Sequence, residues 1–219
     1  MAKARQPIEN KRRIPHQARA AETVAAILEG AAQVLEAGGL AGFTTNAAAE
    51  RAGVSIGTLY QYFADKNALL RAIAEREMGT TLAAVAKALR KETGETAEAS
   101  VRAMVHAIVH AFRGRQRARK AVLQAVLAQG LSLEMMGPVA AFIAQAGNEP
   151  QRGLARLSRE QAFVLSRALM GAIRSAVLEE QPFFKSAAFE DELVRLVLSY
   201  LAALPAAKSA SQERQAAAS

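Results

Sequence analysis

The chain has 219 residues, 28 Lys and Arg against 20 Asp and Glu, a net charge of +8 and no cysteine. This length allows one large core or two small domains, and the lack of cysteine excludes disulfide frameworks and thiolate metal sites. No run of about 18 apolar residues is present, so we expect a cytoplasmic protein without a membrane partner. A positive net charge is compatible with a polyanionic partner but does not by itself select nucleic acid.

The first 20 residues carry six basic side chains, one acid and two prolines. Two interpretations of this predicted flexible arm, residues 1–20, remain open. It is either a solvated terminus or an arm that lies along DNA phosphates or enters a minor groove.

Residues 21–37 have apolar side chains at helical spacing, and the glycine pair that starts at Gly38 ends the pattern. The sequence therefore predicts a first helix with a structural role. Glu22, Glu29 and Glu36 recur every seven residues along it, and we interpret them as a solvated face.

A short alanine-rich helix is predicted over residues 46–52, with Thr44 or Thr45 as its N-cap. Gly53 should end this helix in the left-handed conformation that glycine adopts without strain. A hydroxyl cap followed by a glycine stop thus predicts a short helix that ends in a turn.

A second short helix should begin at Ile56, capped by Ser55. Leu59 and Phe63 lie four residues apart and should share the inward face. Two short helices joined by a turn with glycine form a helix-turn-helix, here residues 44–63.

The outward face of the second helix combines a small residue with hydrogen-bonding side chains. Its members are Gly57, Thr58, Tyr60, Gln61 and Tyr62. Hydroxyls and amides of this kind bond phosphate oxygens, and glutamine can read adenine in the major groove. We therefore expect Thr58 and Gln61 to contact base edges.

The segment from Ala52 to Leu70 resembles the DNA-binding domain of the TetR (tetracycline-repressor-like) transcriptional regulators. The positions that carry the resemblance are Ala52-Gly53-Val54-Ser55, Gly57-Thr58-Leu59-Tyr60, Tyr62-Phe63, Lys66 and Leu69-Leu70. The resemblance implies a three-helix domain over residues 21–81, with Tyr62 and Lys66 on DNA phosphates. The predicted DNA-binding residues are Thr44, Thr45, Ser55, Ile56, Gly57, Thr58, Tyr60, Gln61, Tyr62 and Lys66.

One residue departs from the family pattern. Ala48 stands where the family usually has a larger aliphatic side chain, often isoleucine. An unfilled space there would cost about 2–5 kcal/mol, so the sequence predicts weakened packing around Ala48.

A long helix should begin after an Asp65 cap and end near Arg90 and Lys91. Its first turn belongs to the predicted DNA-binding domain and its last turns to the region that follows. We therefore expect this helix to link the two parts mechanically.

The next predicted helix, residues 97–113, places His106 and His110 four residues apart. Such a pair can chelate a metal, line a cavity or simply lie partly exposed; the chain has one other histidine, and we predict no metal site and no cofactor. The basic run after it, residues 113–120, is interpreted as a solvated turn.

Residues 121–128 should form a helix, and residues 131–146 a second one, split at Gly137-Pro138. Methionine and aromatic side chains on these middle helices suit either core packing or a cavity that binds a small molecule. The predicted effector-pocket residues are Met104, Ile108, Phe112, Met135, Met136 and Phe142.

A capping box at Ser158 to Gln161 opens a helix that should run to about Glu179, and a last helix is predicted over residues 187–204. The apolar stripe of the last helix is wider than one neighbour requires, which favours a second subunit. The predicted dimer-interface residues are Leu165, Leu169, Ile173, Leu193, Val197, Leu198 and Leu201. Residues 205–219 should form a disordered tail.

These patterns predict an all-α protein of about nine helices: an N-terminal helix-turn-helix domain and a helical ligand-binding and dimerisation domain over residues 82–204. By resemblance, it should be a homodimeric transcriptional repressor that a small-molecule effector releases from a palindromic double-stranded operator. A non-specific architectural DNA-binding protein and an all-helical enzyme are the alternatives. No catalytic motif in the sequence supports the enzyme alternative.

Overall fold

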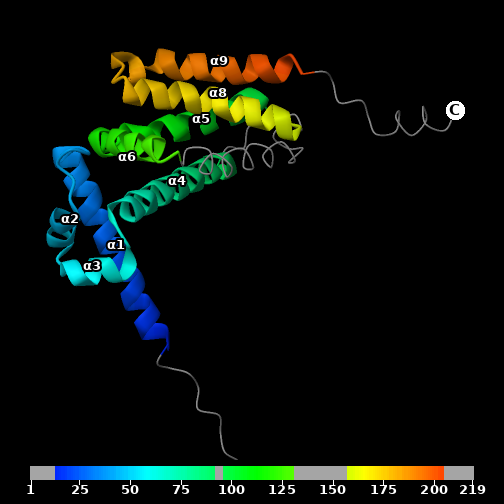
Figure 1. The fold of residues 1–219 in the computed structure, drawn as a ribbon. Coiled ribbons are helices and arrows are strands. Elements are labelled where there is room, and N and C mark those ends of the chain that lie inside the picture. The colour runs from blue at the N-terminus through cyan, green and yellow to red at the C-terminus, as the bar shows by residue number, and fades with distance from the viewer. Residues whose placement is uncertain (1–12, 92–95, 131–156, 205–219) are drawn as a thin grey trace, which may run out of the picture.

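The computed structural model describes residues 13–91, 96–130 and 157–204, and within these ranges all regular structure is helical. The predicted all-α fold is confirmed (Figure 1). In chain order the elements are α1 (Arg13–Gly38), α2 (Thr45–Ala52), α3 (Ile56–Tyr62), α4 (Lys66–Lys91), α5 (Ala97–Arg113), α6 (Gln116–Ala128), α8 (Arg159–Leu178), the 3-10 helix η2 (Pro182–Lys185) and α9 (Ala187–Ala202). The tail predicted over residues 205–219 and most of the N-terminal arm lie outside the described residues.

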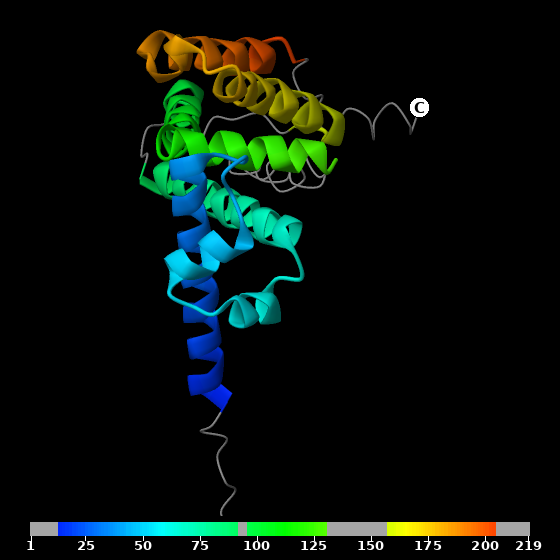
Figure 2. The same ribbon diagram turned by 60° about the vertical axis from the view of Figure 1, so that its left-hand side comes forward.

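The molecule has two hydrophobic cores. The first lies among α1, α2, α3 and the start of α4, and α6 also packs into it. Its largest fully buried side chains are Ile27, Leu35, Phe43, Leu59, Leu69, Leu70 and Ile73. Figures 1 and 2 place α3 at the end of the molecule away from α8 and α9.

Helix α1 begins at Arg13, eight residues before the predicted start at 21. Residues 13–20 are therefore helical, and the predicted arm is too long by this segment. Pro15 lies in the first turn, where a missing N–H costs no helical hydrogen bond because those amides have no partner within the helix.

The second core lies among α4, α5, α8 and α9. Helix α5 has the predicted bounds, and its buried face includes Met104 and Ile108. The predicted capping box of α8 is confirmed: the Ser158 amide donates to Gln161 Oε1 at 2.7 Å, and the Gln161 amide donates to Ser158 Oγ at 3.2 Å.

The second core also accounts for most of the side chains predicted to face a partner subunit. Five of them are at most 3% exposed within their own chain: Leu165, Leu169, Ile173, Leu193 and Val197. Leu198 and Leu201 are partly buried against the same core. The stripe on α9 is wide because it packs against both α8 and α5 of its own chain.

Helix α8 has the length and mean hydropathy of a segment that could cross a membrane. Its apolar face, which includes Leu169 and Ile173, is buried in the second core. The hydropathy of α8 therefore fits a core helix of a folded domain.

Candidate nucleic-acid interface and ligand cavity

Helix α2 begins and ends as its sequence predicts. The Ala47 amide donates to Thr44 Oγ1 at 3.1 Å, which identifies Thr44 as the N-cap. Gly53 closes the helix with φ of 69°, and its N–H donates to the carbonyls of Ala49 and Glu50. A side chain at residue 53 would be strained at this φ, so glycine sets the turn into α3.

Helix α3 begins at Ile56, and the predicted Ser55 cap is confirmed by a 3.0 Å bond from the Thr58 amide to Ser55 Oγ. Leu59 is fully buried and Phe63 is 8% exposed, as predicted. The Thr58 hydroxyl lies 2.9 Å from Ser55 Oγ. Thr58 is therefore engaged at the helix start, whereas Gln61 is exposed.

The outward face of α3 exposes large side chains. Tyr60 is 50% exposed, and Ile56 and Tyr62 are each 38% exposed. The Tyr60 hydroxyl lies 3.2 Å from Thr45 Oγ1 at the start of α2, which joins the two helices of the motif. Exposed aromatic side chains on a seven-residue helix mark a contact surface.

Lys66 is the first residue of α4 and follows α3 by one short turn. The predicted Asp65 cap is confirmed, because the Ala68 amide donates to Asp65 Oδ1 at 2.7 Å. The Lys66 ammonium lies 5.5 Å from the centroid of the buried Phe43 ring. Lys66 therefore stands at a fixed position beside the C-terminal end of α3.

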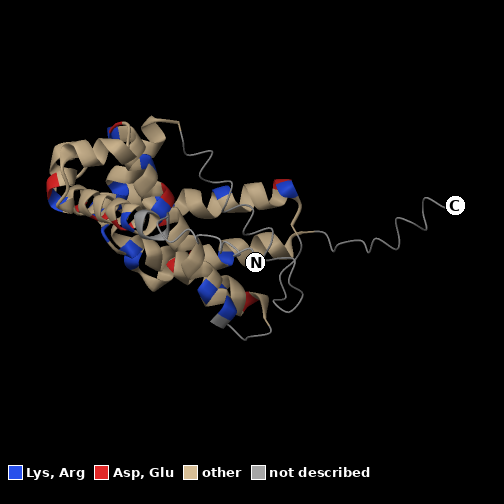
Figure 3. Ribbon diagram, turned by 90° about the horizontal axis from the view of Figure 1, so that it is seen from below, with Lys and Arg blue, Asp and Glu red and all other residues tan. Residues whose placement is uncertain are grey.

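The surplus of positive charge is not concentrated on the helix-turn-helix. Helix α3 carries no charged residue. Figure 3 shows Lys and Arg spread over several helices rather than gathered on one. The contact surface of α3 is thus built from hydroxyls, an amide and aromatic rings.

The space predicted around Ala48 is removed by a close approach of α1 and α2. Ala48 is fully buried, and Gly30 of α1 faces it. A Cβ added at Gly30 would lie 2.7 Å from the Ala52 nitrogen and 3.0 Å from the Ala48 oxygen. The missing aliphatic side chain is compensated by backbone contact, which requires glycine at residue 30.

Residues 113–120, which comprise the end of α5, the turn after it and the start of α6, contact α1. Arg115 pairs with Glu29 of α1, with Nη1 3.0 Å from Oε2. Arg117 donates to the Ala37 carbonyl at 2.9 Å, and the Ala118 amide donates to Glu36 Oε2 at 2.9 Å. We call residues 113–120 the α5–α6 corner.

These contacts correct two interpretations of the sequence. Glu29 and Glu36 are partly exposed but bind residues of the corner, and these contacts hold the basic run against α1 although Arg115 is exposed. Hydrogen bonds from Arg115 and Gln33 lower the pKa of Glu29 from 4.5 to about 2. Arg115 itself has φ of 26°, an unfavourable conformation for a non-glycine residue that its tertiary contacts must maintain.

The corner also joins α4 and α9. Arg119 Nη2 lies 2.5 Å from Glu77 Oε2 of α4. Arg113 pairs with Glu190 of α9. Residues of the corner thus contact α1, α4 and α9. A displacement of the corner would therefore change the packing of helices from both cores.

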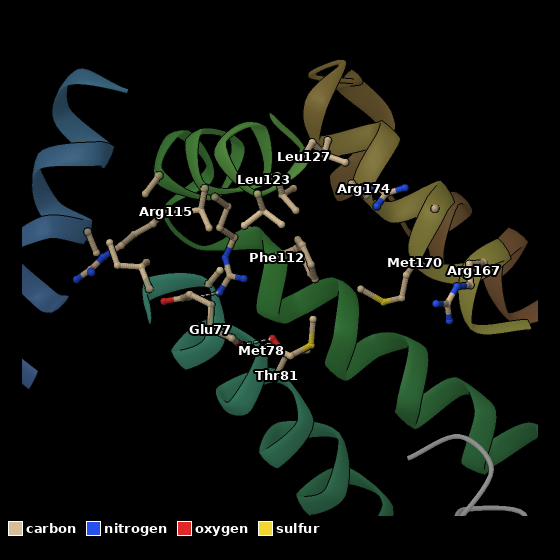
Figure 4. A pocket seen from close by; sticks show the side chains of 18 residues that line it. Glu77, Met78, Thr81, Phe112, Arg115, Leu123, Leu127, Arg167, Met170 and Arg174 are labelled. Atoms are coloured by element: carbon tan, nitrogen blue, oxygen red, sulfur yellow. Dashed lines mark hydrogen bonds and ion pairs between the residues drawn. The ribbon is translucent and has the colours of Figure 1, made fainter. Parts of the chain in front are cut away.

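A cavity of about 120 Å³ lies against this corner (Figure 4). Its walls come from α1, α4, the end of α5, α6 and α8. The lining residues are Ala32, Ile73, Ala74, Glu77, Met78, Thr81, Phe112, Arg115, Ala118, Arg119, Val122, Leu123, Val126, Leu127, Arg167, Met170, Gly171 and Arg174.

Of the residues predicted to line an effector pocket, Phe112 lines this cavity. Met104 and Ile108 pack in the second core instead, because their turn of α5 faces α8 and α9. Met135, Met136 and Phe142 lie outside the described residues. The arginines of the cavity were missed because their spacing along the sequence is that of an ordinary basic surface.

The two histidines of α5 lie away from the cavity. His106 Nδ1 is 2.9 Å from Glu190 Oε2, and the His106 and His110 rings stack with centroids 5.8 Å apart. Among the described residues, no three His, Asp or Glu side chains are placed to hold a metal ion. The structure thus uses His106 in a surface contact between α5 and α9.

Comparison with known proteins identifies the N-terminal domain. The model of the bacterial regulatory proteins of the tetR family matches residues 27–73, which contain the helix-turn-helix. A search of curated proteins found no match.

Solved structures share the fold over most of the chain. A TetR transcriptional regulator from Rhodococcus sp. RHA1 is 19% identical, with a TM-score of 0.61 over 86% of this chain and 100% of the other. The multidrug binding protein EbrR, in complex with imidazole, is 20% identical, with a TM-score of 0.60 over 85% and 98%. The fatty acid degradation regulator FadR from Bacillus halodurans is 16% identical, with a TM-score of 0.59 over 82% and 94%.

Proposed function

We propose that the chain, whose residues 27–73 match the model of the tetR family of bacterial regulatory proteins, is a DNA-binding transcriptional regulator and more specifically a cytoplasmic, sequence-specific repressor. In this proposal a homodimer binds a palindromic operator, and a small-molecule effector releases it. The observation that carries the proposal is the surface of α3, which exposes Tyr60, Gln61 and Tyr62 while Leu59 and Phe63 anchor the helix in the first core.

This surface fits the major groove of double-stranded DNA. Gln61 is exposed and can bond an adenine edge in two places, and the hydroxyl of Tyr62 can reach a phosphate. Gly57 adds no side chain, so the backbone at the start of α3 can approach DNA closely. Lys66 provides a positive charge beside the same face.

The dimer contact in this proposal uses the outward faces of α8 and α9. Phe163 and Val164 of α8 are each 51% exposed, and Leu196 of α9 is 40% exposed. These replace the five buried residues that the sequence predicted for the contact. A two-fold axis here would pair the same two helices from each subunit and place two α3 helices on one side of the dimer.

Such a dimer binds DNA only if its two recognition helices match successive major grooves, about 34–36 Å apart or a multiple of this. Helix α4 connects the DNA-binding surface of α3 with the cavity. It begins at Lys66 beside α3, and its residues from Ile73 to Thr81 line the cavity. A ligand that favours a different position of α4 would therefore weaken operator binding.

The test is binding of the full-length protein to a palindromic duplex from the region next to its own gene, compared with a random duplex of equal length. A specific regulator should favour the operator by about 10³ or more. Equal affinity for both duplexes would instead support a non-specific architectural protein.

A second measurement tests the dimer. Leu196→Glu should give a monomer in sedimentation because a carboxylate would be buried against the partner. The control is Ala128→Glu on α6, an exposed residue that is not part of the proposed contact. A monomeric unmodified protein at micromolar concentration would contradict the proposed dimer.

A further inference from the structure

The charges around the cavity are unequal. Four arginines line it, Arg115, Arg119, Arg167 and Arg174, against one acid, Glu77. Figure 4 shows Arg115 on one side of the cavity and Arg167 and Arg174, from α8, on the other. Among the described residues, neither Arg167 nor Arg174 forms an ion pair with a carboxylate. The cavity therefore has an excess of positive charge.

Two of the arginines that line the cavity, Arg115 and Arg119, pair with a carboxylate, and Arg119 is the more buried of the two. Its side chain is 14% exposed, and its guanidinium lies 5.1 Å from the centroid of the Phe112 ring. Its Nε is buried without a hydrogen-bond partner among the described residues. Burial lowers the pKa of Arg119 from its ordinary value, and Glu77 offsets part of this effect.

Glu77 is less enclosed than Arg119. Its side chain is 28% exposed, and it also lies 3.8 Å from Arg76 on its own helix. Glu77 can therefore leave Arg119 without being stranded in an apolar environment, since it keeps water and a second arginine. The guanidinium of an arginine can donate hydrogen bonds to any carboxylate of suitable geometry. The carboxylate of a ligand can therefore take the place of Glu77.

The rest of the cavity is apolar and small. Ile73, Met78, Phe112, Val122 and Met170 contribute its hydrocarbon and thioether surface. An engineered apolar cavity of about 150 Å³ holds benzene, so a cavity of about 120 Å³ suits a body of similar or slightly smaller size. The occupant should thus combine a short apolar group with an anionic head.

We propose that the cavity binds a small organic carboxylate with a single aromatic ring or a short aliphatic chain, whose carboxylate replaces Glu77 at Arg119. This inference rests on the proposed function, because it names the chemical class of the effector of the repressor. The body of the ligand lies against Phe112 and Met170, and Arg167 and Arg174 stabilise the negative charge at longer range.

The exchange at Arg119 provides a route to α4. The Arg119–Glu77 pair ties α6 to α4. Binding of a carboxylate to Arg119 removes this tie and leaves Arg115 and Arg117 to hold the corner on α1. Helix α4 then moves relative to α6, which changes the position of α3 in each subunit.

The experiment measures binding of four probes to the full-length protein by isothermal titration calorimetry. Phenylacetate and hexanoate are the acids, phenylacetamide is the neutral analogue of the first, and 2-phenylethylamine is the cation. We expect at least one acid to bind at least about tenfold more tightly than the amide and the amine, because only a carboxylate forms charge-assisted hydrogen bonds with Arg119. No binding of either acid, equal affinities or a preference for the amine would overturn the inference.

Three variants locate the head group. Arg119→Gln should weaken binding of the preferred acid by about tenfold or more, whereas Arg195→Gln, an exposed arginine of α9 outside the cavity lining, should not change it. Glu77→Gln should tighten binding because the ligand no longer competes with an internal carboxylate. A weakening in Glu77→Gln would contradict the exchange, and this variant keeps the test decisive if Arg119→Gln does not fold.

The same protein is then titrated onto the palindromic duplex with and without the preferred acid. Release by the acid and not by the amide supports both proposals. Specific operator binding with no acid bound overturns the ligand class and leaves the repressor intact. Acid binding with no preference for the palindrome supports the ligand class and contradicts the repressor.

Discussion

The surface of α3 and the α5–α6 corner use polar side chains in opposite ways. Helix α3 has no charge and keeps Tyr60 and Gln61 exposed, available to an external partner. The corner is dense in arginine, and its guanidinium groups bind Glu29, Ala37 and Glu77 of the same chain. The more strongly charged of the two regions is the one engaged in internal contacts.

This difference shows where the charge of the molecule acts. A basic cluster on a DNA-binding protein is usually attributed to the phosphate backbone. Here Arg115, Arg117 and Arg119 hold α6 against α1 and α4. The position of α3 relative to the rest of the chain therefore depends on ion pairs far from its own surface.

The largest effect is expected from a substitution in the apolar core beneath α3. Leu59→Ala removes the fully buried anchor of α3 and should cost about 2–5 kcal/mol of stability in the first core. Hydrogen exchange of the α2 and α3 amides should report it. The control is the exposed residue two positions further on, Gln61→Ala, which should leave exchange nearly unchanged. Equal effects of both substitutions would mean that α3 is not held by Leu59.

A second prediction concerns α1, which packs against α2 of the helix-turn-helix and against the corner. Gly30→Ala places a Cβ 2.7 Å from the Ala52 nitrogen and should cost about 1–3 kcal/mol in thermal or urea unfolding. Gly79→Ala in α4 is the matched control. Its Cβ would meet nothing within 4 Å, so the better helix propensity of alanine should stabilise that variant. Destabilisation by both would point to helix bending rather than to close packing at Gly30.

A third prediction sharpens the roles within the α3 surface. Gln61→Ala should change which operator sequences are preferred, by about 1–3 kcal/mol at the affected base pair. Lys66→Ala should weaken binding to all duplexes similarly and reduce the magnitude of the salt slope by about 1 per contact. Binding-site selection and salt titration measure the two effects. Uniform loss in the glutamine variant would remove Gln61 from base readout.

The helix-turn-helix could be predicted closely because its signals are local. Thr44, Gly53 and Ser55 each act within four residues of the helix end that they define. The burial of Leu59 and Phe63 follows from their spacing on one short helix. None of these inferences needed to know what packs against the domain.

The corner and the cavity could not be predicted in this way. Arg115 and Glu29 are 86 residues apart in the chain, and nothing in the spacing of either residue reveals the other. A glutamate on the polar face of a helix has the same pattern whether it meets water or an arginine. The broad apolar stripe of α9 was ambiguous for the same reason, since two neighbours in one chain and one neighbour in a second chain both widen a stripe.

The smallest effect is expected from the pH dependence of the Arg115–Glu29 pair, which joins the corner to α1. The pKa of Glu29 is about 2 in the folded protein, lowered from 4.5 by Arg115 and Gln33, so the folded state favours the ionised carboxylate. Its contribution to stability should be fully present well above pH 4.5 and be lost as the pH falls toward 2. Because the Glu29 side chain is 43% exposed, water and salt reduce this contribution. Urea unfolding of the unmodified protein and of Glu29→Gln should therefore differ slightly at neutral pH and converge toward pH 2, with a smaller difference in high salt.

NMR titration of the Glu29 carboxyl carbon measures the pKa of Glu29 directly. Arg115→Ala should raise this pKa, because Arg115 provides the strongest of the hydrogen bonds that lower it. An unchanged pKa in that variant would show that the corner does not hold α1 through this pair.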